Sequence, residues 1–200
     1  MEQPISKPKW EAKVSTKLAN ASADQIWPFL EDFFGIHKYF PSLAASYGIH
    51  GSNGEIGSIR YCEGSSIPSQ ETKDNKERST VISWSKEKLT AIDPAEKSLS
   101  YEIIDSNTGF HSYVSTIQIN KNPIPAGDST IVGSGDEDGG RLGCVIEWSF
   151  SVDAVGGWRL EDLVKKYEVG LHRMAQKMED ILNNSGEGRK TNDRKADEER

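Results

Sequence analysis

The C-terminal part of the chain carries one long amphipathic pattern, directly after a series of strand-like segments. Between residues 160 and 182, apolar residues recur every three or four positions, which predicts a helix of roughly 23 residues and about 35 Å. Such a helix is long enough to cross a whole small domain. Its apolar face comprises Leu160, Leu163, Val164, Tyr167, Leu171, Met174, Met178, Ile181 and Leu182, and the opposite face mostly carries Lys165, Lys166, Glu168, Arg173 and Lys177.

The segments before this helix alternate apolar and polar residues, which is typical of half-buried strands. Turn sequences such as Gly51-Ser52-Asn53-Gly54 separate them. Consecutive strands with short links and no helix between them predict an antiparallel meander. We therefore expect an α+β fold in which a curved antiparallel sheet of about seven strands wraps around the long helix. The expected strands are 10–18, 45–50, 56–63, 80–92, 98–105, 111–119 and 144–152.

Two short helices are expected after the first strand. Ser22 and Gln25 form a capping-box pattern at the start of the first of them. Pro28 is placed near its first turn, where a missing N–H costs least. A second helix is expected from Phe33 to Phe40, because Pro41 then ends it.

The length of 200 residues fits one domain. We assign this domain to residues 9–183, after a flexible leader at 1–8 and before a disordered tail at 184–200, where charge, Gly and Ser dominate. The segments 69–79 and 120–143 are polar or rich in Gly, Asp and Pro, and we expect both to be mobile loops.

Charge and composition exclude several classes of function. The formal net charge of −7 argues against nucleic acid or an anionic membrane as the main partner. No apolar run approaches the roughly 20 residues of a spanning helix, and the N-terminus lacks a signal-peptide core, so the expected location is the cytoplasm. The four histidines show no metal-ligand spacing, and two cysteines form no disulfide framework. We therefore expect no metal and no cofactor.

Strand parity indicates which polar groups face the interior. Glu87 shares a face with Leu89, whereas Lys86 and Lys88 occupy the opposite face, so Glu87 is the better inward carboxylate. Parity leaves the direction of Arg60 open. A strand Arg or Glu is often a solvated surface charge, and a buried pair can be purely structural, although such pairs contribute little net stability. A bent sheet that closes on one helix also tends to leave a cavity, which favours an apolar ligand.

Several segments resemble the plant branch of the START-like, helix-grip superfamily, also described as the polyketide cyclase/dehydrase and lipid transport superfamily. Within it, the resemblance is strongest to proteins like lachrymatory-factor synthase, and it spans roughly residues 9–182. The segments that carry the resemblance are Lys9-Trp10, His37-Lys38, Pro41-Ser42-Leu43, Gly57-Ser58-Ile59-Arg60-Tyr61, Trp84-Ser85-Lys86-Glu87-Lys88-Leu89 and Trp148-Ser149-Phe150.

This resemblance implies that Arg60 and Glu87 form an inward charged pair and that Tyr113 lies in the pocket. In the synthase group such a pair is implicated in rearranging an alkenyl sulfenic acid into a thial S-oxide without a cofactor. An arginine can hold the sulfenate oxygen while a carboxylate moves the proton. Ile103 stands where those proteins carry another tyrosine, which implies one hydroxyl fewer in this pocket.

The abscisic acid receptors of the same superfamily imply a second map. Lys38 falls on their carboxylate-binding lysine, and Ser66-Ile67-Pro68 resembles their gate loop. Their His-Arg-Leu latch is replaced by Thr108-Gly109-Phe110, which argues against hormone-gated phosphatase inhibition.

These observations leave three functions open. The first is a cofactor-free isomerase or lyase that uses Arg60, Glu87 and Tyr113, and the second is a non-catalytic carrier or sensor of a lipid, hormone or phenolic compound. The third, on weaker grounds, is a protein-interaction module that uses the gate loop. In the first two the partner is a small hydrophobic or amphipathic ligand, without membrane insertion. The expected ligand-binding residues are Lys38, Cys62, Ile67, Pro68, Leu89, Ile103, Trp148, Phe150, Tyr167 and Leu171.

Overall fold

The strand nearest the N-terminus, β1 (Lys9–Leu18), pairs antiparallel with the last strand of the chain, β7 (Cys144–Asp153). The computed structural model describes residues 8–64, 82–121 and 143–196, with residues 185–196 as backbone only. The strands between them are β2 (Leu43–His50), β3 (Ile59–Gly64), β4 (Ser83–Asp93), β5 (Ser98–Ser106) and β6 (Val114–Lys121).

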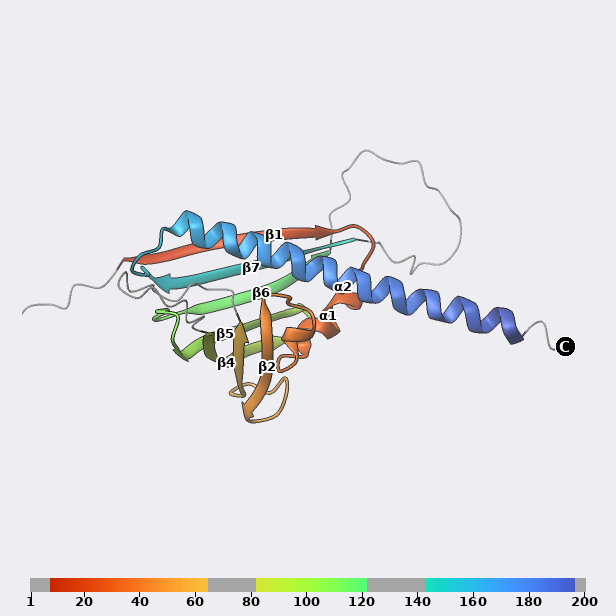
Figure 1. Ribbon diagram of the computed structural model, residues 1–200, viewed down its shortest axis with the longest axis horizontal. Coiled ribbons are helices and arrows are strands. Elements are labelled where there is room, and N and C mark those ends of the chain that lie inside the picture. The colour runs from red at the N-terminus through yellow and green to blue at the C-terminus, as the bar shows by residue number, and fades with distance from the viewer. Residues whose placement is uncertain (1–7, 65–81, 122–142, 197–200) are drawn as a thin grey trace, which may run out of the picture.

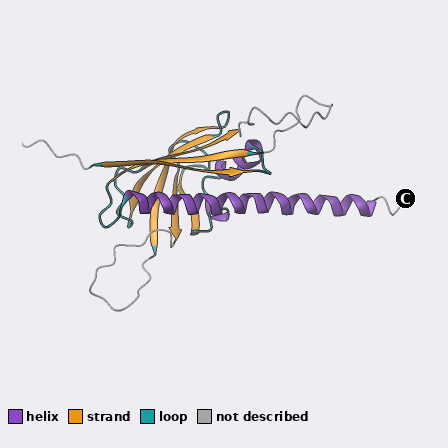
Figure 2. Ribbon diagram, turned by 90° about the horizontal axis from the view of Figure 1, so that it is seen from above, coloured by secondary structure: helices purple, strands orange, loops and turns teal. Residues whose placement is uncertain are grey.

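All seven strands form one antiparallel sheet in the order β1-β7-β6-β5-β4-β3-β2. From β2 to β7 each strand pairs with the next one along the chain. The predicted meander is therefore confirmed. Figure 1 shows the sheet curving beneath the C-terminal helix α2 (Leu160–Ala196), and Figure 2 shows α2 along one side of the sheet and extending beyond it. The predicted helix-grip α+β fold is confirmed.

The core lies between the concave face of the sheet and α2. In β7 the alternation is complete, because Cys144, Ile146, Trp148, Phe150 and Val152 are all buried and the residues between them are half-exposed. The expected apolar face of α2 is also buried, with the side chains of Leu163, Leu171, Met174 and Met178 at 1% exposure or less. None of the helices in the described ranges has the length and apolar character needed to cross a membrane.

The helix α1 (Ala23–Glu31) begins at the predicted capping box. The backbone N–H of Gln25 donates to Ser22 Oγ at 3.3 Å, and the backbone N–H of Ser22 donates to Gln25 Oε1 at 2.9 Å. Pro28 is the sixth residue of α1, so the placement in the first turn is wrong and the helix lacks one internal N–H donor.

Two other predicted boundaries differ from the structure. Instead of a helix over 33–40 there is one 3-10 turn, η1 (Ile36–Lys38), since the short segment bends before and after it. At the other end, α2 continues to Ala196, so residues 184–196 are helical rather than disordered. The apolar repeat stops near Leu182 because the last turns project beyond the sheet (Figure 2), and an apolar repeat marks only the part of a helix that packs on a core.

Candidate functional site

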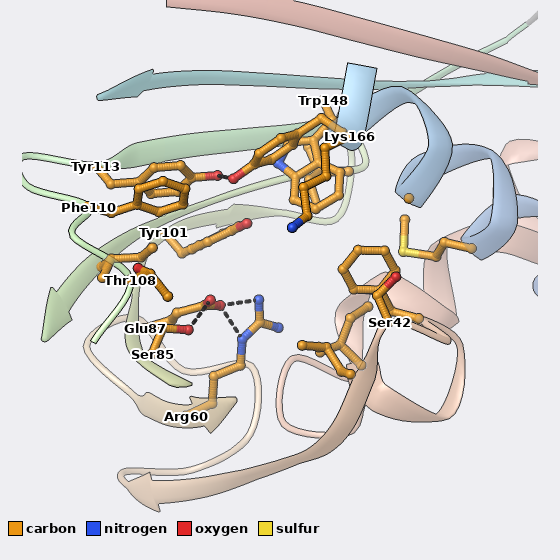
Figure 3. A pocket seen from close by; sticks show the side chains of 18 residues that line it. Ser42, Arg60, Ser85, Glu87, Tyr101, Thr108, Phe110, Tyr113, Trp148 and Lys166 are labelled. Carbon is orange, nitrogen blue, oxygen red and sulfur yellow. Dashed lines mark hydrogen bonds and ion pairs between the residues drawn. The ribbon is translucent and has the colours of Figure 1, made fainter. Parts of the chain in front are cut away.

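A cavity of about 110 Å³ lies between the concave face of the sheet and α2. Its walls are mainly apolar and aromatic, with a small number of polar side chains that point inward (Figure 3). This combination is the usual composition of a small-molecule site. The lining residues are Ile36, Phe40, Ser42, Leu43, Arg60, Ser85, Glu87, Tyr101, Ile103, Thr108, Phe110, Tyr113, Ile117, Trp148, Lys166, Tyr167, Gly170 and Met174.

Arg60 and Glu87 form a buried ion pair on one wall of the cavity. Nε and Nη2 of Arg60 both approach Glu87 Oε2, at 2.8 and 2.6 Å, and their side chains are only 7% and 12% exposed. The other carboxylate oxygen, Oε1, accepts a hydrogen bond from Ser85 Oγ at 2.8 Å. The carboxylate thus has a charged partner on one oxygen and a neutral donor on the other.

The strand register brings this pair together. Arg60 on β3 lies directly opposite Glu87 on β4, and cross-strand neighbours on one face of a sheet are close enough to interact. The inner face of β3 carries Arg60 and Cys62, and Ser58 just before the strand is buried too, whereas Ile59 and Tyr61 are half-exposed. The polar residues of this strand therefore face inward, which explains why parity alone could not orient Arg60.

An irregularity in the β4–β5 ladder adjoins this pair. Lys86 pairs with Asp105 and Glu87 pairs with Ile103, so Ile104 is one extra residue on β5. A bulge of this kind resets the alternation of side chains. It allows Tyr101 and Ile103 to line the cavity while Asp105 binds Lys86 on the outer face, at 2.7 Å.

The guanidinium of Arg60 is also held from other directions. Its Nη1 donates to the carbonyl oxygen of Phe33 at 2.7 Å, just after α1. The guanidinium carbon lies 4.0 Å from the centroid of the Phe33 ring and 5.0 Å from that of the Tyr101 ring. Burial alone would lower the pKa of Arg60, but the adjacent Glu87 carboxylate outweighs it, so this pKa is raised and the guanidinium stays charged.

Three tyrosines also line the cavity, and one of them, Tyr101, adjoins the Arg60 guanidinium. The hydroxyl oxygens of Tyr113 and Tyr167 are 2.7 Å apart, and Tyr101 lies 6.1 Å from Tyr113 between ring centroids. Burial raises the pKa of all three phenols well above the ordinary value. They are therefore neutral at physiological pH and act as hydrogen-bond donors and acceptors rather than as phenolates.

The position of Lys166 differs from the prediction, because the helical pattern placed this residue on the solvent face of α2. Its side chain reaches over the edge of the apolar face and lines the cavity next to Tyr167. Figure 3 shows its amine pointing toward the space between the tyrosines and the ion pair. A long flexible side chain can do this because its methylene groups pack on apolar surface while the amine extends further.

The structure brings together six of the predicted site residues and separates others from them. Lys38 lies on the surface, where it binds Asp32 at 2.8 Å, and it is not among the residues that line the cavity. Cys62, Leu89, Phe150 and Leu171 are buried but belong to the core behind the cavity wall rather than to its lining. Ile67 and Pro68 lie outside the described residues. The six that line the cavity are Arg60, Glu87, Ile103, Tyr113, Trp148 and Tyr167.

Some of the residues that line the cavity were not predicted, although for one of them the sequence held a signal. Tyr101 precedes the predicted Ile103 by two positions, so strand alternation places both on one face. A tyrosine ring is therefore present next to Arg60 despite the isoleucine at position 103. Phe110 and Thr108 lie in the segment between β5 and β6, where no periodicity could orient them.

Two other groups have no part in the chemistry of this cavity. Cys62 and Cys144 are free, buried thiols, and burial raises their pKa values to about 12 and about 11. Both belong to the buried core. Within the described ranges, no three His, Cys, Asp or Glu side chains gather as a metal site.

Comparison with solved structures supports the same architecture. An uncharacterised protein from Bacillus thuringiensis has a TM-score of 0.57 at 16% identity, over 84% of this chain and 98% of that one. The protein XoxI from Bacillus cereus has a TM-score of 0.56 at 17% identity, over 86% and 97%. Ginseng major latex-like protein 151 from Panax ginseng has a TM-score of 0.56 at 14% identity, over 86% and 97%. At such identities these similarities establish the fold alone.

The sequence itself matches a family model over most of its length. The model describes polyketide cyclase/dehydrase and lipid transport proteins, and it covers residues 10–179, from the start of β1 into the packed part of α2. The match thus includes every strand of the sheet and all the residues that line the cavity. The chain belongs to the polyketide cyclase/dehydrase and lipid transport family.

Proposed function

We propose that the protein binds a small, mainly apolar molecule in this cavity and relocates a proton on it through Arg60 and Glu87, without a cofactor. The observation that carries the proposal is a buried ion pair at the edge of an aromatic cavity. Such a pair is a poor source of stability, because removing two charges from water costs about as much as their attraction returns. Its position next to open space supports a role in chemistry.

The size of the cavity limits the ligand. A volume of about 110 Å³ is below the range of roughly 300–1,000 Å³ for drug-sized ligands and close to the roughly 150 Å³ of an engineered cavity that binds benzene. We therefore propose a ligand about as large as a short-chain or single-ring compound. This size argues against a long-chain lipid in the conformation described here.

The geometry suits a proton transfer. Arg60 stays charged and can hold an oxygen of the ligand, because its contacts with Glu87 and Phe33 use three of its five N–H groups. Glu87 can accept a proton from one atom of the ligand and return it to another. The surrounding aromatic rings exclude water, which strengthens these electrostatic interactions. This arrangement supports a cofactor-free isomerase or lyase of the lachrymatory-factor synthase type.

The alternative is a carrier or sensor without turnover, which the largely aromatic lining also favours. The two proposals differ in what they require of Glu87. A carrier binds its ligand through apolar contact, so Glu87→Gln would leave saturable binding of a small phenol nearly unchanged and there would be no reaction to lose. An enzyme would lose turnover by at least about 100-fold, the usual contribution of a general acid or base.

The experiment mixes the purified protein with freshly generated alkenyl sulfenic acid and measures thial S-oxide. We expect more product than in buffer, and a loss of this excess in Glu87→Gln. The matched control is Glu102→Gln, which alters an exposed carboxylate on the neighbouring strand that is 3.4 Å from Lys88. If the wild-type protein yields no more product than buffer, this reaction is excluded. If phenol also fails to bind, the cavity is not a ligand site.

A further inference from the structure

Lys166 has an environment unlike that of the other lysines whose contacts are described. Five lysines (Lys13, Lys38, Lys86, Lys88 and Lys97) have a carboxylate within 4.0 Å. Lys166 has no such carboxylate among the described residues; its amine lies 5.3 Å from the centroid of the Trp158 ring and lines the cavity. Burial without a counter-charge disfavours the charged form of this half-buried amine, and the face of the Trp158 ring offsets only part of that loss.

As a consequence, a sizeable fraction of the Lys166 amine is neutral near physiological pH. Burial lowers the pKa of Lys166 to about 8. At pH 7 about 10% of such a side chain carries a free lone pair, compared with about 0.04% for a lysine of ordinary pKa near 10.4. A desolvated lysine of this kind is the form that reacts with carbonyl compounds.

We propose that Lys166 condenses with small aldehydes that enter the cavity and holds them as an imine. The neutral Nζ adds to the carbonyl carbon, forming the C–N bond as the carbonyl π bond breaks. One proton then moves from nitrogen to the former carbonyl oxygen, which gives a carbinolamine. This oxygen takes a second proton from a neighbouring hydroxyl and leaves as water when the C=N bond forms, and the nitrogen gives up its remaining proton to that hydroxyl, which restores the donor. No oxidant, reductant or cofactor takes part. The amine and the aldehyde are the reactants, and the imine and water are the products.

The cavity provides what this condensation needs. Its aromatic lining limits water, whose excess would reverse the reaction. A proton donor for the departing oxygen stands on the same wall, since the hydroxyls of Tyr113 and Tyr167 share one hydrogen bond between them and that bond uses only one of their two protons. Burial raises the pKa of both phenols, so both protons are retained at neutral pH.

This inference rests on the proposed function only in that a small ligand must enter the cavity. It assigns the ligand to the aldehydes and places its covalent attachment on Lys166 of α2. The proposed proton transfer instead uses Arg60 and Glu87 on the sheet side of the cavity. The other ionisable side chains of the cavity are Arg60 on β3, Glu87 on β4, Tyr101 on β5, Tyr113 just before β6 and Tyr167 on α2. None of them is a primary amine, so a reduced imine within the cavity identifies Lys166.

The experiment treats the full chain at pH 7 with propanal and sodium cyanoborohydride, which reduces an imine to a stable secondary amine. Peptide mapping by mass spectrometry then locates each propyl group. We expect Lys166 to be labelled at least about tenfold faster than the exposed neighbour Lys165, because burial increases the free-amine fraction of Lys166. The rate should rise with pH and level off above about pH 8. Lys165→Met should keep this labelling and Lys166→Met should lose it.

Binding of phenol, measured in parallel by calorimetry, separates the two ideas. If phenol binds saturably but Lys166 is labelled no faster than Lys165, the imine inference is wrong and the ligand cavity stands. If phenol does not bind and Lys166 is not preferred, both are wrong. Labelling of Lys166 that phenol suppresses in proportion to its occupancy would support the inference and place the reaction inside the cavity.

Discussion

Arg60 and Glu87 can be replaced by apolar residues of similar volume, singly and together, through Arg60→Met and Glu87→Leu. Each single substitution leaves one buried charge without its partner, because the two side chains are only 7% and 12% exposed and share one carboxylate oxygen. The double substitution removes both charges. The three variants and the wild-type protein form a double-mutant cycle for the pair.

The expected energies follow from these contacts. Removing one partner of a buried ion pair costs about 3–5 kcal/mol, so the two single losses sum to about 6–10 kcal/mol. In the double variant the remaining cost is mainly the carbonyl oxygen of Phe33, which loses the hydrogen bond from Arg60 Nη1, at about 1–3 kcal/mol. The double variant should therefore fall short of the sum by at least about 3 kcal/mol.

Urea unfolding at pH 7, followed by far-ultraviolet circular dichroism, measures each free energy of unfolding. The slope of that free energy against urea concentration should agree among the four proteins, so that differences in midpoint report stability. The exposed pair Lys88 and Glu102, 3.4 Å apart and 43% and 37% exposed, provides a matched cycle whose coupling should stay below about 1 kcal/mol.

Two results would refute this reasoning. If the buried cycle is additive within about 0.5 kcal/mol, the charges do not depend on each other as their geometry indicates. If the double variant loses more than about 5 kcal/mol, the pair contributes net stability, and its burial has a structural explanation that needs no chemistry. A stable double variant without turnover is the outcome that the proposed function requires.

Three further expectations concern other residues. Burial lowers the pKa of Lys166 to about 8, so the unfolded chain binds more protons than the folded one between about pH 8 and about pH 10.4. The stability of the wild-type protein should therefore rise through this window relative to that of Lys166→Met. Thermal melts that show the same pH dependence for both proteins would contradict this. Burial raises the pKa values of Cys62 and Cys144 to about 12 and about 11, so neither thiol should react with a disulfide reagent at pH 8 in the folded protein. Both should react in concentrated urea. Reaction of either thiol in the native protein would overturn its placement in the core. In Gly170→Ala the new methyl group would lie 3.1 Å from Phe40 and push that ring toward the cavity. The affinity for phenol, measured by calorimetry, should therefore fall by about tenfold, which is the effect of about one methylene group. Unchanged affinity would show that Gly170 does not shape the site.

The fold was predictable because its elements bury regular faces. The alternation from Cys144 to Val152 and the helical repeat from Leu160 to Leu182 each place apolar residues on one side, and burial in the structure follows them. The end of α2 was not predictable in this way, because turns beyond the sheet are not required to carry an apolar face.

The site was predictable only in part. Glu87 could be oriented because lysines flank it, whereas Arg60 stands on a strand whose inner face is polar, and only the resemblance to a family placed it inward. Tyr101 was missed although alternation places it on the same face as the predicted Ile103, and the bulge at Ile104 changes the alternation only after that residue. Lys166 was assigned to solvent because helical periodicity describes where the Cα atoms lie and not how far a long side chain extends.

The polar groups of the cavity come from different elements, with Arg60 on β3, Glu87 on β4, Tyr101 on β5 and Lys166 on α2. A single nucleotide change can therefore exchange one of these groups and leave the backbone hydrogen bonds of every strand in place. Selection can alter the chemistry of such a cavity one residue at a time while the scaffold persists. The shared fold of proteins from bacilli and ginseng at 14–17% identity shows that this scaffold accepts very different sequences.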